Sequence, residues 1–346
     1  MKKRLTICLV TANRPKEFRK AVESIANLSI EDYEVIVADD SSDDESEKIT
    51  REVLPEAVYF RNDPPLREMA NSNKCISLAK TDMVCLFHDD DLLAPAYFDQ
   101  ILPYMSRNED IDMAFTGRIM VDQDDVELAR QVLKEGESHY IYAAHDILDF
   151  MLFGKELKDY RVFINTPGLV FRKSVFEKFG GFDSSIDTHC DTDFLFKSLL
   201  VSRKVMFVNE PLYTNKLWYG VSGRTKSSER GDVLTAQKGV RDNFIAFCEK
   251  NGYSHYVGLK KKIYEAFALE GTRFNGFLIW ISLRYKGGYF AKVRSLFRTA
   301  GSIIGLNPKV LLYPRFYFVF LGSVLVPQFV QKQFLGILLK KYNQKA

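Results

Sequence analysis

The stretch Met83-Val84-Cys85-Leu86-Phe87-His88-Asp89-Asp90-Asp91 places three consecutive carboxylates directly after a short apolar run. A short apolar run bounded by polar residues is typical of a strand that is buried on both faces of a sheet. Pro95, four residues beyond the acids, suits the first turn of a helix. The stretch therefore predicts a buried strand, an acidic loop at its carboxyl end and a helix after the loop.

The same alternation continues on both sides of this stretch. Upstream, strands are expected over Leu5–Val10, Tyr33–Ala38 and Val58–Phe60, with helices from Pro15, from Ser41 and over Arg67–Ala79. Downstream, strands are expected over Met113–Ile119, Leu169–Phe171 and Val205–Val208, with helices near 145–153 and 191–202. This alternation predicts an α/β fold with a mostly parallel central sheet flanked by helices, and such sheets bind ligands at the carboxyl ends of their strands.

The three adjacent carboxylates Asp89, Asp90 and Asp91 repel one another unless a cation neutralises them. Carboxylate oxygens suit Mg²⁺ or Mn²⁺, which proteins usually hold with one or two carboxylates together with substrate phosphates. The structural alternative is an acidic helix start, because Asp is favoured at helix N-caps. The position at the carboxyl edge of the predicted sheet favours the metal site.

A second acidic cluster, Asp39-Asp40-Ser41-Ser42-Asp43-Asp44, follows the second predicted strand. Ser41 or Asp43 could cap the next helix. Asp39 or Asp40 could instead accept hydrogen bonds from a nucleobase or from ribose hydroxyls, as acidic residues after the second strand do in other nucleotide-binding folds. Arg14, at the end of the first strand, is well placed for a phosphate, although a single surface arginine is usually a solvated charge.

Five motifs, in this order and spacing, resemble family 2 glycosyltransferases over roughly residues 4–225. They are Val10–Arg14, Val37–Asp43, Asn73 with the strand and loop to Pro95, Thr166–Arg172 with Phe179–Asp183, and Cys190–Phe194. The resemblance implies a GT-A fold and inverting transfer of a single hexosyl group from a nucleotide diphosphate sugar, with UDP as the expected nucleotide. No Gln-x-x-Arg-Trp motif of the processive synthases is present.

The resemblance also implies roles for particular residues. The donor would be bound by Thr11, Asn13, Arg14, Asp39, Asp40, Arg67, Asn73 and Asp89. Asp90, with Asp91 as a further candidate, would bind Mn²⁺ or Mg²⁺. Asp191 matches the catalytic base, with a helix N-cap as its structural alternative, and Lys216 and Trp218 lie in a stretch similar to the loop that closes over the donor.

Two residues depart from the family pattern. His88 stands where many members have the first Asp of the DxD motif, and Cys190 replaces the usual Glu. These departures leave open an alternative function, a non-catalytic nucleotide-sugar-binding scaffold subunit of a polysaccharide-assembly complex. Asp191 is the only base candidate that the Cys190 replacement leaves in this motif.

Charge is divided unevenly along the 346 residues, although the net charge is only +3. Residues 271–346 hold twelve Lys and Arg and no Asp or Glu, so the first 270 residues carry a net charge of −9. We expect a GT-A catalytic domain over 1–225, with a nucleotide-sugar half over about 1–110 and an acceptor half over about 111–225. A helical, basic and aromatic region is expected over 226–346.

The basic region points to an anionic partner. The uncharged run between Arg315 and Lys332 is shorter than the roughly 20 residues that span a bilayer. We expect attachment to an anionic membrane surface, and a helical subdomain packed on the body is the alternative. Nothing in the region resembles a nucleic-acid module, so a nucleic-acid partner is not expected.

The N-terminus and the cysteines bear on location. Lys2-Lys3-Arg4 precedes an apolar run of only six residues, and Asn13-Arg14-Pro15 follows instead of a small-residue cleavage site, which predicts a buried first strand instead of a signal peptide. The five cysteines are scattered without a CxxC pair, as in a reducing cytoplasm. We expect a peripheral protein on the inner face of the cell membrane, acting on a lipid-linked glycan acceptor in cell-surface polysaccharide synthesis.

Overall fold

The computed structural model describes residues 3–132, 136–153, 166–184, 186, 189–216, 233–273, 289–312 and 314–325. The described residues of Met1–Leu148, Leu157–Ser184 and Phe194–Gly220 form one compact unit, which contains the sheet. Those of Asp149–Glu156, Ser185–Asp193 and Val221–Ala346 form a second unit. The second unit therefore includes short segments that precede residue 225 in the sequence.

The first half of the sheet is parallel, with the strand order β3-β2-β1-β4. Its strands are β1 (Leu5–Thr11), β2 (Tyr33–Asp39), β3 (Val58–Arg61) and β4 (Met83–His88). The helices that connect them are α1 (Pro15–Ala26), α2 (Glu45–Val53) and α3 (Glu68–Leu78). Every residue of β1 is buried, as expected for the first strand of a doubly covered sheet.

The second half of the sheet is mixed. It contains β5 (Leu92–Leu93), β6 (Ile111–Val121), β7 (Glu127–Gln131), β8 (His139–Ala143), β9 (Val170–Arg172) and β10 (Lys204–Lys216). β6 and β10 are parallel, whereas β9 runs antiparallel to both β4 and β6. β7 is antiparallel to β6, because the five-residue connection between them is too short for a parallel crossover. The sheet is thus parallel where strand and helix alternate regularly, and mixed beyond that part.

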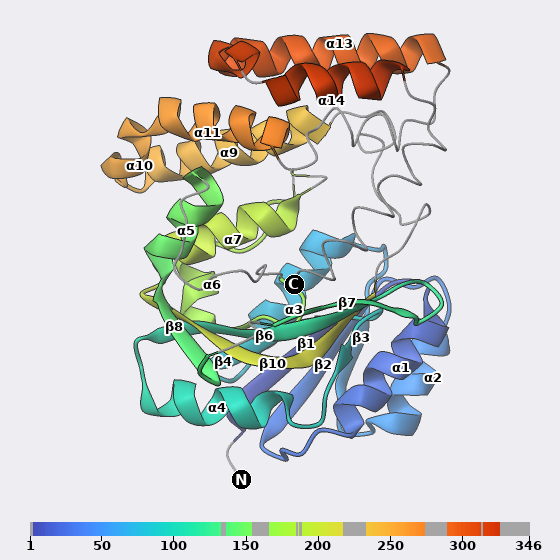
Figure 1. Ribbon diagram of the computed structural model, residues 1–346. Helices are drawn as coiled ribbons and strands as arrows, with labels where there is room; N and C mark the ends of the chain where they lie inside the picture. Colours follow the sequence, from blue (N-terminus) through green and yellow to red (C-terminus); the bar gives the residue numbers. More distant parts are fainter. Residues whose placement is uncertain are drawn as a thin grey trace. The chain divides into compact units, whose positions relative to one another are not determined.

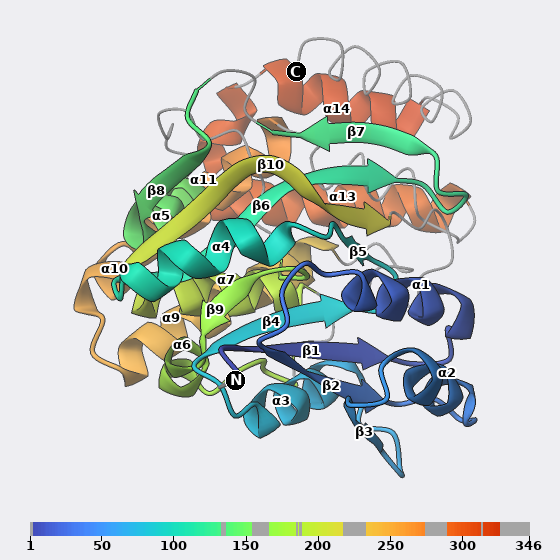
Figure 2. The ribbon, with the colours of Figure 1, turned by 90° about the horizontal axis from the view of Figure 1, so that it is seen from below.

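Helices cover both faces of the sheet. Figure 1 shows α1, α2 and α4 (Tyr97–Arg107) on one face, and α3 and α6 (Lys173–Phe179) on the other. The strands are seen side by side from below in Figure 2. Phe18, Val22 and Ile25 recur along α1 at helical spacing and are fully buried in the same core as Ile7 and Leu9 of β1. This core fixes the carboxyl ends of β1 and β4 next to each other.

A two-glycine turn follows α6, and Asn73 of α3 holds it. The Asn73 side chain donates from Nδ2 to the Phe182 carbonyl and accepts from the Phe182 amide, both at 2.8 Å. Gly180 and Gly181 both have a φ of +84°, which L side chains adopt only at a cost. Asn73, expected among the donor-binding residues, therefore makes its described contacts with this turn.

The turn yields a stability prediction. A Cβ at Gly181 would lie 2.5 Å from Oδ1 of Asn73 and 2.6 Å from the Phe176 ring, whereas a Cβ at Gly180 meets no atom within 4 Å. Gly181→Ala is expected to lower the free energy of unfolding by about 2–4 kcal/mol, combining the left-handed conformation with overpacking. Gly180→Ala, the matched control, should cost only about 1 kcal/mol. Urea denaturation of both variants would contradict this account if their losses were equal.

Two of the remaining described helices lie between sheet strands in the sequence, and the others follow β10. The first two are α5 (Ala144–Phe153) and α7 (Cys190–Val201), and the others are α9 (Val233–Lys250), α10 (Ser254–Gly258), α11 (Lys260–Arg273), α13 (Tyr289–Leu306), the 3₁₀ helix η1 (Pro308–Leu312) and α14 (Pro314–Leu325). Phe267, Leu296, Ile303, Val310 and Phe316 form a small core among the last of these. Among the described residues, no helix combines the length and the apolar character needed to cross a membrane.

Candidate functional site

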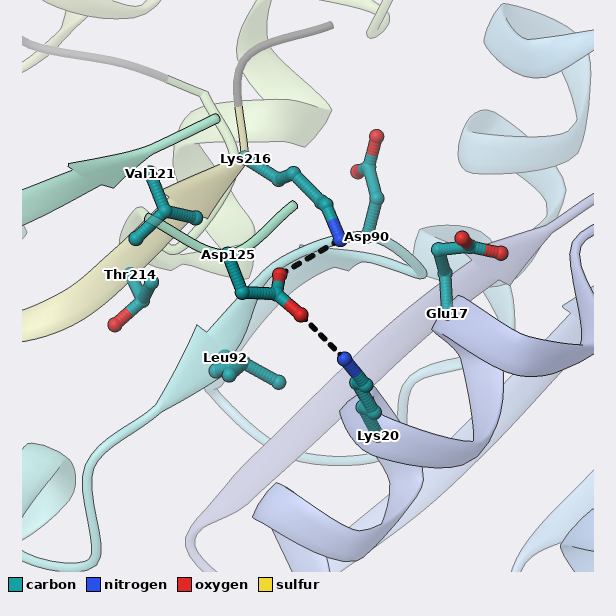
Figure 3. Close-up of a pocket in the computed structure, with 8 residues that line it drawn as sticks. All are labelled: Glu17, Lys20, Asp90, Leu92, Val121, Asp125, Thr214 and Lys216. Carbon is teal, nitrogen blue, oxygen red and sulfur yellow. Dashed lines mark hydrogen bonds and ion pairs between the residues drawn. The ribbon is translucent and has the colours of Figure 1, made fainter. Parts of the chain in front are cut away.

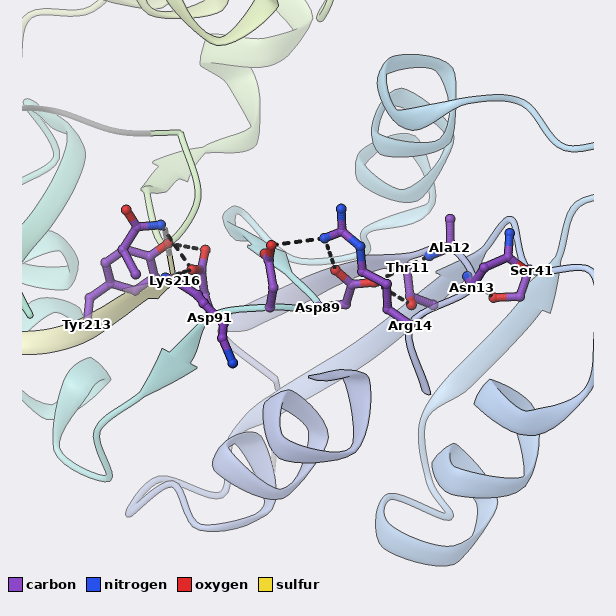
Figure 4. Close-up of polar contacts among 11 residues, drawn as sticks. Thr11, Ala12, Asn13, Arg14, Ser41, Asp89, Asp91, Tyr213 and Lys216 are labelled. Atoms are coloured by element: carbon purple, nitrogen blue, oxygen red, sulfur yellow. Dashed lines mark hydrogen bonds and ion pairs between the residues drawn. The ribbon is translucent and has the colours of Figure 1, made fainter. Parts of the chain in front are cut away.

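Loops from the carboxyl ends of β1, β2 and β4 meet at one edge of the sheet. Thr11 is paired with Asp39 across β1 and β2, and Val10 is paired with His88 across β1 and β4. The residues that follow these pairs therefore leave the sheet side by side. Figure 4 shows the polar contacts that result, from Ser41 through Arg14 and the acidic loop to Lys216.

Asp89 turns toward β1. Its Oδ2 accepts a hydrogen bond from the Thr11 hydroxyl at 2.7 Å, and its Oδ1 lies 3.3 Å from Nη1 of Arg14. The side chain is buried. Asp89 therefore joins the acidic loop to the loop after β1.

Asp90 lies beside Asp89 and shares the same arginine. Nη1 of Arg14 is 2.9 Å from Oδ2 of Asp90, so one guanidinium spans both carboxylates. Asp90 is partly exposed and lines a small pocket. Of the three acids it is the most exposed, since Asp89 and Asp91 are buried.

Asp91 turns away from β1 and bonds to residues of β10. Both of its oxygens accept hydrogen bonds: Oδ2 from the Tyr213 hydroxyl, and Oδ1 from the Asn215 side chain and the Lys216 amide, each at 3.0 Å. The side chain is buried. Asp91 thus fastens the acidic loop to the end of β10.

The acidic loop offers ligands for a divalent cation. One ligand atom from each of His88, Asp90 and Asp91 lies within 4.8 Å of the others. Two carboxylates and an imidazole fit Mn²⁺ or Mg²⁺ by their chemistry, although Asp91 already accepts three hydrogen bonds. His88 enters this group through the fold, whereas the sequence marked it only as a departure from the family pattern.

Burial and the proximity of these carboxylates together raise the pKa values of two of them, Asp89 and Asp91. Burial, together with the charge of Asp90, raises the pKa of Asp89 to about 6, and Arg14 and Thr11 only partly offset this. The same two causes raise the pKa of Asp91 to about 6. The loop therefore holds more negative charge than its protein surroundings compensate, which is the condition that favours a bound cation.

A pH dependence follows for the metal-free protein. The pKa of Asp89 rises from the ordinary 3.8 to about 6 on folding, so the stability it contributes is full below pH 3.8 and is lost as the pH rises through 6. Relative to Asp89→Asn, the wild-type protein should lose up to about 3 kcal/mol of unfolding free energy between pH 4 and pH 7. Urea denaturation in a chelating buffer would measure this difference. A constant difference, or one equal to that of the exposed control Asp124→Asn, would contradict it.

The carboxylates after β2 are held by protein groups. Asp39 is fully buried and accepts from the Ser41 amide at 2.7 Å and from the Tyr59 hydroxyl at 2.6 Å. Oδ1 of Asp40 accepts from Nδ2 of Asn62 at 2.8 Å. Asn62 in turn contacts the side chains of Asn71 and Lys74, which makes a polar network at this edge of the sheet.

Asn13 joins the loop after β1 to the loop after β2. The backbone amide of Asn13 donates to the Ser41 hydroxyl at 2.8 Å, and its side-chain Oδ1 accepts from the Ser42 backbone amide at 2.9 Å. Ser41 does not cap a helix, because α2 begins at Glu45 and its N-cap residue is Asp44. Asp43, the other cap candidate, accepts from the Glu45 amide at 3.2 Å. Arg67 is exposed and has a φ of +71° immediately before α3.

Asp191 belongs to the second unit. It is the second residue of α7, which begins at Cys190, so it lies within the first turn of the helix. Its Oδ1 accepts from the Thr192 amide at 2.8 Å. Two residues on, Asp193 is fully buried and accepts from Asn243 at 2.8 Å.

Of the two candidates from the predicted donor loop, the structure describes Lys216 but not Trp218. The Lys216 amide bonds to Asp91, and its ammonium lies 2.7 Å from Oδ1 of Asp125. Trp218 lies outside the described residues. Asp125 was not a candidate from the sequence, but Asp122-Gln123-Asp124-Asp125 is a third acidic cluster after a strand, and the same rule applied there would have found it.

Comparisons with known proteins identify relatives of this chain. A family model described as glycosyl transferase family 2 matches residues 6–180. The uncharacterized protein MT1568 of Mycobacterium tuberculosis is 26% identical over 248 residues, covering 69% of this chain and 72% of that protein. A glucosyl-dolichyl phosphate glucuronosyltransferase of Haloferax volcanii is 23% identical over 189 residues, covering 54% of this chain and 57% of that enzyme.

A solved structure resembles the fold. The crystal structure of S. aureus TarS 1-349 in complex with UDP-GlcNAc matches with a TM-score of 0.62 at 13% identity, covering 96% of this chain and 91% of that one. At this identity the likeness bears on the fold. It confirms the α/β class and the GT-A fold predicted from the sequence.

Proposed function

The chain belongs to glycosyl transferase family 2, and from this membership we propose that it moves one sugar, with inversion, from a UDP-sugar to a hydroxyl of a glycan acceptor. Family membership makes the protein a glycosyltransferase and disfavours the non-catalytic scaffold subunit. The observation that carries the proposal is the meeting of Arg14, Asp89 and Asp90 at the carboxyl edge of a GT-A sheet. UDP as the nucleotide is supported by the TarS complexes with UDP-GlcNAc and with UDP.

The departing nucleoside diphosphate needs its growing negative charge stabilised. Mn²⁺ or Mg²⁺, held by Asp90 beside His88 and Asp91, would supply such charge when bound. The Arg14 guanidinium already lies among these carboxylates and offers donors that match phosphate oxygens. Thr11 fixes Asp89 and so keeps the loop in register with Arg14.

The acceptor hydroxyl needs a base, and we assign that role to Asp191. Asp191 is partly exposed in the first turn of α7, where the helix N-terminus favours negative charge. The aspartate would take the hydroxyl proton as the acceptor oxygen attacks the anomeric carbon. On the donor side, Asp40 and its neighbour Asn62 would meet the uracil, with Asn13 and Arg67 at the rim.

The test is calorimetric titration of UDP into the full-length protein, with and without Mn²⁺. We expect UDP to bind only when the metal is present, and we expect GDP and dTDP to bind more weakly. Release of UDP from UDP-sugars in the presence of glycan acceptors would then identify the sugar. If none of the three nucleotides binds with Mn²⁺ or Mg²⁺, the proposed donor site is wrong.

For the acceptor, we propose a lipid-linked glycan presented at the inner face of the cell membrane. The relative named as a glucosyl-dolichyl phosphate glucuronosyltransferase supports a lipid-linked substrate. The exposed face of α13 carries Phe290, Arg294, Phe297 and Arg298 at helical spacing. Exposed apolar residues also stand on η1 and α14, namely Leu312, Tyr317, Leu321 and Leu325.

The exposed residues of α13, η1 and α14 together have the composition of a membrane-interfacial surface. Phe290 is 87% exposed and Leu312 is 79% exposed, and large apolar side chains left in water at this level are typical of interaction surfaces. Aromatic and aliphatic residues beside arginines suit the boundary between acyl chains and anionic headgroups. Each basic residue near such a surface contributes about 1 kcal/mol of attraction.

Membrane binding is testable with vesicles. The protein is expected to sediment with phosphatidylglycerol-containing vesicles at low salt and to stay in the supernatant with neutral phosphatidylcholine vesicles. Leu312→Glu together with Leu321→Glu should weaken binding by roughly tenfold or more, because two apolar side chains leave the bilayer. Leu78→Glu, an exposed leucine of the sheet unit, is the control. Equal binding to both vesicle types would contradict the proposal.

A further inference from the structure

The turn between β6 and β7 presents a carboxylate to the end of β10. Asp125 lies between two lysines: its Oδ1 is 2.7 Å from the Lys216 ammonium, and its Oδ2 is 2.5 Å from the Lys20 ammonium of α1. Figure 3 shows both ion pairs, and shows Asp90 beside Lys216 in the same pocket. Asp125 thus joins three elements that are distant in the sequence.

The turn is built to hold this carboxylate in place. Oδ1 of Asp122 accepts from the amides of Asp124 and Val126, both at 2.9 Å. Asp125 has a φ of +62°, a conformation that non-glycine residues rarely adopt and that Asp and Asn tolerate best. Hydrogen bonds from Lys20 and Lys216 lower the pKa of Asp125 below its ordinary value, so the carboxylate is ionised at neutral pH.

Lys216 is the member of this cluster that water hardly reaches. Its side chain is 7% exposed, whereas those of Lys20 and Asp125 are about half exposed. A buried ammonium requires a charged or polar partner at hydrogen-bond distance, and Asp125 is one. The same pocket is lined by two lysines, Lys20 and Lys216, and by the carboxylates of Glu17, Asp90 and Asp125.

We propose that Asp125 is a positioning residue, which holds the Lys216 ammonium where it binds a phosphate oxygen of the nucleoside diphosphate. The inference rests on the proposed function, since it takes Asp90 as part of the donor site. Asp90 and Lys216 line the same pocket, so a diphosphate bound at Asp90 would lie beside Lys216. A lysine ammonium binds phosphate as a compact point charge, so its placement decides its contribution.

The chain offers a conservative variant and a matched control. Asn keeps the left-handed conformation of residue 125, so Asp125→Asn removes the charge and leaves the turn. Asp124→Asn removes one charge from the same turn, at an exposed carboxylate that makes neither of the two ion pairs. Both variants change the net charge equally. A difference between their effects therefore measures the contribution of the two ion pairs of Asp125.

The first measurement needs no nucleotide. Lysine acetylation by a water-soluble reagent, followed by mass spectrometry of the full chain, gives the labelling rate of Lys216 relative to the exposed Lys80. We expect Asp125→Asn to change that rate by about three- to tenfold, and Asp124→Asn to leave it unchanged. Equal rates in the wild type and Asp125→Asn would overturn the positioning role.

The second measurement is UDP titration with Mn²⁺ on Asp125→Asn, Lys216→Met and the double variant. Lys216→Met should weaken UDP binding by about 10- to 100-fold, as expected for a hydrogen bond to a charged group. Asp125→Asn should weaken it by about three- to tenfold, and the double variant should bind no more weakly than Lys216→Met alone. Additive losses, or unchanged binding in Asp125→Asn, would overturn the inference. Absence of UDP binding in the wild type would instead refute the proposed function, and with it the phosphate contact, while the labelling result still decides the positioning.

Discussion

Replacing Asp191 by Asn is expected to lower kcat by about 10²- to 10⁴-fold, the usual loss when a general base is removed. The amide keeps the size of the side chain and its acceptor oxygen toward the Thr192 amide, so the first turn of α7 should stay intact. The affinity for UDP should stay within about twofold of the wild type, because this carboxylate acts on the acceptor. Initial rates of UDP release with a glycan acceptor, together with UDP calorimetry, measure both quantities.

Asp193 provides the contrast for Asp191 within the same helix turn. Asp193 is fully buried and accepts a hydrogen bond from Asn243. Asp193→Ala should therefore cost about 1–3 kcal/mol of unfolding free energy by leaving buried donors unpaired, with a smaller effect on turnover of the folded fraction. If Asp191→Asn turns over as the wild type does, Asp191 is not the base.

Replacing Asp90 by Asn is expected to remove the Mn²⁺-dependent part of UDP binding, a loss of at least about 100-fold. Asn offers one neutral oxygen where Asp90 offers a charged carboxylate, and hard divalent cations prefer the latter. The ion pair between Asp90 and Arg14 is lost as well, whereas the contact of Arg14 with Asp89 remains. Titration of UDP at fixed Mn²⁺, and of Mn²⁺ alone by the loss of its free electron-paramagnetic-resonance signal, measures the two effects.

Asp91→Asn separates the roles of two neighbouring acids. Asp91 is buried and accepts from Tyr213, Asn215 and the Lys216 amide, so its loss should reduce stability by about 1–3 kcal/mol while metal-dependent binding persists. If Asp90→Asn and Asp91→Asn lost Mn²⁺ affinity equally, Asp91 would be a metal ligand as important as Asp90. Unchanged Mn²⁺ affinity in Asp90→Asn would remove Asp90 from the site.

Local pattern was sufficient to predict the frame of the site. The apolar runs at Leu5–Val10, Tyr33–Ala38 and Met83–Phe87 lie within β1, β2 and β4, and the acids after them leave the sheet at one edge. This succeeds because parallel strands joined by helices must place all their carboxyl ends on the same side. Helix starts were less predictable: α4 begins at Tyr97, after Pro95, and α2 begins at Glu45.

The direction that each carboxylate takes was beyond the sequence. Three adjacent aspartates have the same local pattern, yet Asp89 bonds to Thr11, 78 residues away, and Asp91 bonds to Tyr213, 122 residues away. The backbone turn after β4 points successive side chains toward different strands. Only the packing of those strands decides which partner each acid meets.

The α/β class, the acidic edge of the sheet, the family and the basic character of residues 271–346 could all be inferred without a structure. These properties reside in composition, in the spacing of apolar residues and in short motifs, which are local along the chain. The tertiary structure alone decided that Asn73 holds a glycine turn, that His88 joins the acidic group, and that Asp125 reaches Lys216. The contacts of Asn73 and of Asp125 join segments far apart in the sequence, and their proximity depends on how the core packs the elements that carry them. His88 is close to Asp90 and Asp91 in the sequence, but the backbone conformation after β4 decides that their ligand atoms come together.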